Sequence, residues 1–213
     1  MAAQRITHRY RLETCLAESN IDRPPVALWR HFPVDDQYPQ ELAAAHLGFQ
    51  KLYDFDFVKV TPASSFAIKD WGADDEWRGT IEGTRDYTKR VVHEPEDWLK
   101  LPVLDPRNGH LAKQLECLQL IIKELGSETP VIQTIFNPLS QAKNLVGGEN
   151  LMVHLRRFPE AIHAGLKTIA KSTQLFIEAA QQTGIAGIFY AVQHARYDML
   201  STKEYDEFGR YYD

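Results

Sequence analysis

The stretch that decides the fold is Pro130-Val-Ile-Gln-Thr-Ile-Phe-Asn-Pro138. Its β-branched and aromatic residues lie between two prolines, which favours a short buried strand followed directly by a helix. Comparable apolar runs, each bounded by proline or glycine, occupy residues 26–32, 57–61 and 188–192. Four such runs, separated by longer segments, predict a parallel α/β sheet and argue against a β-sandwich.

Helical patterns fill most of the segments between these runs. Apolar residues recur at three- and four-residue steps from Leu42 to Leu52, from Leu111 to Leu125 and from Ile162 to Ala180. Ser201 and Glu204 form a capping-box pattern, which predicts one more helix near the end of the sequence.

Two strand-like pieces, residues 80–84 and 87–92, interrupt this alternation and predict a β-hairpin inserted after the second strand, where it could act as a lid. A (β/α)8 TIM barrel has eight strands and about 250 residues. The 213 residues are therefore expected to form a single domain, residues 1–213, that supplies roughly the first half of such a barrel. A complete open sheet is the alternative.

The charge balance restricts the partners. The sequence has 24 Lys and Arg against 29 Asp and Glu, a formal charge of −5, and 44% hydrophobic residues. This composition is typical of a globular protein that binds neither nucleic acid nor membranes. With no signal peptide or long apolar run, we expect a cytoplasmic protein. Cys15 and Cys117 have no metal-ligand spacing, so we expect reduced packing residues and no metal site.

Polar residues follow or end each predicted strand, where the catalytic groups of parallel α/β proteins collect. We expect one group to be catalytic, namely Arg30, His31, Lys59 and His194. We expect a second group to bind the substrate, namely Thr61, Asn137, Ser140 and Gln193. So many hydrogen-bond donors suit a carboxylated or phosphorylated small molecule.

Each charged candidate also has a structural interpretation. Arg30 either holds a substrate carboxylate or pairs with Asp35 or Asp36. Lys59 either points into the barrel, where burial lowers its pKa, or reaches a neighbouring acid. His31 and His194 either transfer protons or act as structural hydrogen-bonding groups.

At these residues the sequence resembles the uroporphyrinogen decarboxylase family. Arg23-Pro-Pro-Val-Ala-Leu-Trp-Arg30 resembles the RPPVWLMR opening of that family, whose last arginine holds substrate carboxylates. Residues 56–61, 130–138 and 186–195 resemble its second, third and fourth strands, and residues 200–208 resemble the helix that follows the fourth. The resemblance implies a (β/α)8 barrel, usually a homodimer, with a cofactor-free tetrapyrrole site at the carboxyl ends of its strands.

The sequence departs from the family pattern at several positions. Thr61-Pro-Ala63 stands where the family has FSD, so the aspartate that stabilises positive charge during loss of CO₂ is absent. Residues 31–35 replace QAGRY and its second arginine. Asn144 stands where a tyrosine is expected, and Gln193 where a serine is expected.

The resemblance implies three functions. The first is a carboxy-lyase that acts on a tetrapyrrole or related polycarboxylate in porphyrin-type biosynthesis. The second is the methyltransferase branch of the same superfamily, which uses zinc and a corrinoid protein. The third is a non-catalytic binding protein, which the missing aspartate favours.

Overall fold

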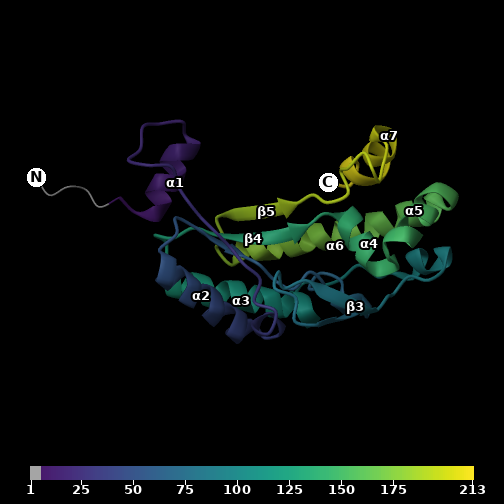
Figure 1. Cartoon of the computed structure of the whole chain (residues 1–213), viewed down its shortest axis with the longest axis horizontal. Coiled ribbons are helices and arrows are strands. Elements are labelled where there is room, and N and C mark those ends of the chain that lie inside the picture. The colour runs from purple at the N-terminus through teal and green to yellow at the C-terminus, as the bar shows by residue number, and fades with distance from the viewer. Residues whose placement is uncertain (1–5) are drawn as a thin grey trace, which may run out of the picture.

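The computed structural model describes residues 6–213 as a mixed α/β fold. Three strands form a parallel sheet in the order β1 (Val58–Val60), β4 (Val131–Phe136) and β5 (Gly187–Ala191). The register places Val60 beside Gln133 and Gln133 beside Ile188. The parallel sheet predicted from the sequence is therefore present, with β4 at its centre (Figure 1).

Helices account for most of the rest of the chain. The α-helices are α1 (His8–Leu16), α2 (Pro39–Tyr53), α3 (Gly109–Leu125), α4 (Pro138–Val146), α5 (Gly148–Arg157), α6 (Pro159–Gln182) and α7 (Thr202–Tyr205). Four shorter turns of helix are η1 (Asp35–Gln37), η2 (Lys69–Trp71), η3 (Pro95–Lys100) and η4 (Asp206–Arg210). In Figure 1, α2 and α3 lie side by side and α6 runs along β4.

The transition from β4 to α4 follows directly from the sequence. Asn137 caps α4, accepting a hydrogen bond from the Ser140 N–H at 3.2 Å, and Pro138 occupies the first turn, where no N–H is needed. Within the sheet, the Thr134 hydroxyl donates to the Val60 carbonyl at 2.7 Å and ties β4 to β1. Because α4 begins directly after β4, Asn137 and Ser140 lie at the carboxyl end of the sheet.

The main core lies between the sheet and its helices. Val60 and Ile135 of the sheet pack in one buried cluster with Leu118 and Ile121 of α3 and Phe176 of α6. A second cluster joins α4, α5 and α6 around Trp98, which is 1% exposed. Burial of this much apolar surface is the main stabilising contribution to the fold.

The predicted strand at residues 26–32 was wrong. These residues run as extended chain outside any sheet, with Leu28 and Trp29 exposed. Pro24 and Pro25 have no N–H to donate, so the chain just before this segment cannot form a regular ladder. Val26 instead pairs with Asp56, whose backbone N–H donates to the Val26 carbonyl at 2.9 Å.

A hairpin does follow β1, but its first strand was misplaced. The antiparallel pair is β2 (Asp74–Trp77) and β3 (Arg85–Lys89), whereas residues 80–84 form the turn between them. Arg85 anchors the hairpin, because its guanidinium donates to Asp75 at 2.5 Å, to the Pro33 carbonyl at 2.8 Å and to Asp36 at 3.2 Å. The hairpin is thereby fastened to the segment that follows residue 32.

Other sequence expectations had mixed outcomes. The capping box at Ser201 and Glu204 is present at α7. Cys117 is buried as expected, but Cys15 is exposed and is not a packing residue. None of the helices within residues 6–213 has the length and apolar character needed to cross a membrane.

Candidate functional site

Lys59 is a buried cation held between two aromatic rings. It lies in β1 with 5% of its surface exposed, and its Nζ is 4.7 Å from the centre of the Trp29 ring and 4.4 Å from that of Phe189. Trp29 comes from the extended segment and Phe189 from β5, and their rings are 5.6 Å apart. Within residues 6–213, no carboxylate forms an ion pair with Lys59. We call Lys59, Trp29 and Phe189 the lysine slot.

Burial lowers the pKa of Lys59 to about 8. Aromatic faces attract a cation but replace its hydration only in part. Of the two interpretations drawn from the sequence, the contact with a neighbouring acid is not found within residues 6–213, and the side chain lies between the two rings.

Two histidines lie close enough for Lys59 to affect their protonation. Burial and the Lys59 charge lower the pKa of His46 to about 4, and the same two causes lower the pKa of His31. His46 of α2 is therefore neutral, and its Nε2 accepts the Thr61 N–H at 3.1 Å. Lys59 thus has two neutral imidazoles near it, and no carboxylate contributes to the shift of its pKa. Such surroundings suit an incoming anion.

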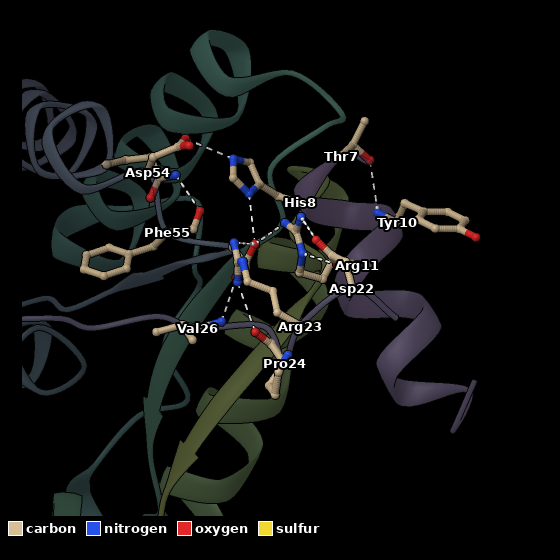
Figure 2. Close-up of polar contacts among 12 residues, drawn as sticks. Thr7, His8, Tyr10, Arg11, Asp22, Arg23, Pro24, Val26, Asp54 and Phe55 are labelled. Atoms are coloured by element: carbon tan, nitrogen blue, oxygen red, sulfur yellow. Dashed lines mark hydrogen bonds and ion pairs between the residues drawn. The ribbon is translucent and has the colours of Figure 1, made fainter. Parts of the chain in front are cut away.

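An arginine-rich cluster around Asp56 positions the segment that carries Trp29. Asp56 is fully buried and accepts hydrogen bonds from Arg11 at 2.6 Å, from Arg23 at 2.5 and 3.0 Å, and from the Val26 N–H at 2.7 Å. Figure 2 shows the side chains of His8, Arg11 and Arg23 converging from α1 and the segment that follows it. Asp56 is a structural anchor, because its carboxylate ties α1 and the segment after it to the start of β1.

A second polar group gathers at the carboxyl ends of β4 and β5. The Ser140 hydroxyl donates to Asn137 Oδ1, and its oxygen lies 3.4 Å from Nδ1 of His194. The Asn137 amide donates onward to Asp213 at 3.1 Å. Three of the predicted site residues, Asn137, Ser140 and His194, are thus in contact.

His194 has an unusual backbone conformation for its residue type. Its φ is 69°, in the left-handed region, while its side chain is buried and burial, followed by the Lys143 charge, lowers its pKa. Such strain persists only where the surroundings enforce it, and it is concentrated at functional sites. We therefore keep His194 among the candidate site residues.

The remaining predicted residues are more scattered. Arg30 is exposed, and its Nε donates to the His31 carbonyl at 3.2 Å. Neither Asp35 nor Asp36 pairs with it, since Asp36 binds Arg85. Gln193 is exposed, and the buried Thr61 hydroxyl has no hydrogen-bond partner within residues 6–213.

Sequence reasoning missed three residues of the site, namely Trp29, His46 and Phe189. His46 lies on the buried face of α2, but the apolar pattern that defined this helix skips a histidine. Trp29 and Phe189 were assigned only to strands. A tryptophan directly before Arg30 and a lysine inside an apolar strand were the available signals.

Comparisons with known proteins found similar sequences and a similar solved structure. Uroporphyrinogen decarboxylase of Enterobacter sp. (strain 638) is 28% identical over 119 residues, which are 53% of this chain and 33% of that protein. The enzymes named uroporphyrinogen decarboxylase from Salmonella typhimurium and Klebsiella pneumoniae (strain 342) are 27% identical over the same length. The matched region thus spans about a third of these relatives.

The fold is also that of a solved structure. A methyltransferase from Methanosarcina mazei superposes with a TM-score of 0.84 at 17% identity, covering 98% of this chain and 65% of that one. The family model described as uroporphyrinogen decarboxylase (URO-D) matches residues 7–212. With this match over almost all of its length, the chain belongs to the uroporphyrinogen decarboxylase family.

Proposed function

We propose that this chain binds a small molecule with one or more carboxylates at the lysine slot and acts as a carboxy-lyase. The observation that carries the proposal is the buried ammonium of Lys59, which has no carboxylate partner within residues 6–213. A buried charge without a counterion is costly, and a bound anion would offset that cost. A tetrapyrrole or a smaller polycarboxylate has the required groups.

The residues around the slot support a division of roles. Arg30, at the exposed rim, is suited to holding a peripheral carboxylate. Lys59 would lie next to the reacting carbon, where its positive charge stabilises the electron pair left as CO₂ departs. In this role Lys59 differs from the aspartate that the family supplies after its second strand, where this sequence has Thr61-Pro-Ala63, because the two groups carry opposite charge.

We further propose that the three-stranded sheet is part of a (β/α)8 barrel. The parallel order β1-β4-β5 and the likeness to the methyltransferase, of which the chain covers 65%, support this arrangement. In such a barrel the lysine slot and the group at His194 would both face the carboxyl-end opening.

Methyl transfer is the second candidate, favoured by the likeness to the Methanosarcina mazei protein. In this superfamily branch a zinc ion activates the methyl acceptor. Residues 6–213 do not fit that ion, because they contain no group of three or more His, Cys, Asp or Glu side chains placed to bind a metal. Metal analysis of the purified chain tests this candidate, and near-stoichiometric zinc would support it.

A binding experiment tests the proposed site. Calorimetry with propane-1,2,3-tricarboxylate should show binding that Lys59→Met abolishes, with an expected loss of about 2–5 kcal/mol for a buried charge pair. Arg30→Ala should cost about 1 kcal/mol or less because Arg30 is exposed. Lys51→Met, at an exposed position on α2, is the control.

Unchanged binding by Lys59→Met would overturn the site. Release of CO₂ from uroporphyrinogen, or from a smaller polycarboxylate, then tests the reaction. Binding without CO₂ release from any of these acids would favour the non-catalytic alternative.

A further inference from the structure

Two of the side chains that shield the amine of Lys59, the rings of the lysine slot, are partly exposed at the surface. The cavity next to Lys59 and Trp29 is about 10 Å³, too small for more than one water molecule. Trp29 is nevertheless 46% exposed and Phe189 37% exposed. A ligand therefore reaches Nζ by displacing surface rings and leaves the core intact.

Trp29 is the easier of the two rings to displace. It lies on extended chain outside any sheet, whereas Phe189 is in β5 and its neighbours are paired with β4. Val26 is anchored to Asp56 on one side of Trp29, and Phe32 packs against His46 at a ring distance of 5.0 Å on the other. The residues between these anchors form a short flap over the amine.

The environment of Nζ raises the fraction of neutral amine above that of an exposed lysine. The rings give it no hydrogen-bond acceptor, and no carboxylate within residues 6–213 holds a proton on it. The titratable groups that face it are His31 on the flap and His46 on α2, and both are disposed to remain uncharged. A lysine desolvated in an apolar pocket is the usual form of an amine nucleophile.

We propose that Lys59 forms an imine with the ketone carbon of a β-keto acid, which deepens the carboxy-lyase function and rests on it. The neutral amine adds to the carbonyl, the carbinolamine oxygen takes up a proton from solvent, and water leaves, giving a protonated imine. The bond to the carboxylate then breaks, CO₂ departs, and its electron pair moves into the iminium to give an enamine. A proton from solvent restores the iminium at carbon, and water releases the ketone and free Lys59.

Reductive trapping tests this step. The full chain is incubated with acetoacetate and sodium cyanoborohydride, and the adduct is located by peptide mass spectrometry. At pH 7.5 an amine with a pKa of about 8 has a neutral fraction about 200 times that of an ordinary lysine. We expect Lys59 to be modified about tenfold or more faster than the exposed Lys51 and Lys123.

The pH dependence distinguishes this site from surface labelling. Trapping at Lys59 should be half-maximal near pH 8, whereas labelling of the exposed lysines should still be rising at pH 9.5. Trp29→Leu removes one wall and should shift the Lys59 midpoint upward while leaving labelling at Lys51 unchanged. Equal labelling of all three lysines, or a Lys59 midpoint like theirs, would overturn the imine.

A charge-preserving variant separates this inference from the proposed function. Lys59→Arg keeps a cation but cannot form an imine, so it should retain binding of propane-1,2,3-tricarboxylate and lose all trapping at this position. If the unmodified chain binds that tricarboxylate but gives no adduct at Lys59, the imine fails and carboxylate binding stands. If it does neither, both fail.

Discussion

Val26 and Asp56 are joined by two hydrogen bonds, one of which uses a carboxylate where a strand would use a backbone carbonyl. The Asp56 N–H donates to the Val26 carbonyl at 2.9 Å, and the Val26 N–H donates to Asp56 Oδ2 at 2.7 Å. The carboxylate thus supplies the second hydrogen bond of this pairing. It also links the flap to β1, because Asp56 lies just before that strand.

Asp56→Asn should destabilise the protein by about 3 kcal/mol. The change removes the charge that Arg11 and Arg23 share and leaves the buried Arg11 with only Asp22. Urea unfolding measures the loss. Asp54→Asn is the matched control, since Asp54 is exposed and contacts only His8 among the described side chains. Equal effects of the two changes would contradict the anchoring role.

The same carboxylate should make stability depend on acid. Burial opposes ionisation of Asp56, but hydrogen bonds from Arg23, Val26, His8 and Arg11 outweigh it and hold its pKa well below the usual range. This stabilisation is fully present above the unfolded pKa of about 3.9 and is lost as the pH falls toward the folded value. The free energy of unfolding, measured in urea at a series of pH values, should therefore fall more steeply below about pH 4 for the unmodified chain than for Asp56→Asn.

Lys59 should have a linkage of the same sign, but at higher pH. Its pKa falls from 10.5 to about 8 on folding, so the folded state binds fewer protons between these values and stability rises with pH there. The gain is on the order of 3 kcal/mol, and the corresponding deficit is fully present below pH 8. Lys59→Met should therefore be more stable than the unmodified chain at pH 7, with a difference that shrinks by pH 9.5. A destabilised Lys59→Met would contradict this.

Ser140→Ala should affect catalysis more than folding. It removes the hydroxyl next to His194 and costs about 1 kcal/mol of stability, because the helix cap from Asn137 to the backbone N–H remains. The pH profile of CO₂ release should shift, since His194 loses its Nδ1 partner. Ser201→Ala, which removes a helix-capping hydroxyl at α7, is the control and should leave that profile unchanged.

Gly83→Ala and Gly79→Ala should differ although both residues have positive φ. A Cβ at Gly83 would lie 2.4 Å from the Cβ of His31, whereas one at Gly79 meets nothing within 4 Å. Gly79→Ala should cost about 1 kcal/mol from backbone strain alone. Gly83→Ala should cost more and loosen the hairpin from His31, which limited proteolysis of the hairpin can detect.

Elements with strong local signals were predicted well. β4 has the predicted limits because prolines bound it, and the stripe of α6 is buried at Ile162, Leu166 and Phe176. On α2 the buried face is rotated, since His46 and Gln50 are buried and Leu52 is 71% exposed. The prediction of the buried face used only the spacing of apolar residues. This helix instead buries His46 and Gln50, whose side chains form hydrogen bonds with backbone groups of Thr61 and Phe55.

The site was harder to predict than the fold. Asn137, Ser140 and His194 come together because neighbouring parallel strands bring their ends to the same edge. The contacts of Lys59 depend instead on an irregular segment, whose path is set by tertiary hydrogen bonds to Asp56. No local pattern in residues 24–32 encodes that path. The exposure of Arg30 follows from it as well.

The position of Trp29 beside Lys59 means that its fluorescence can report the entry of a ligand into the lysine slot. An indole that lies 4.7 Å from an ammonium and is 46% exposed has an emission sensitive to both charge and water. Any molecule that enters beside Lys59 must shift this ring, while the indole of Trp98, at 1% exposure, stays in the interior. Trp71 and Trp77 also emit, so occupancy of the lysine slot is reported by the part of the fluorescence change that Trp29→Leu removes.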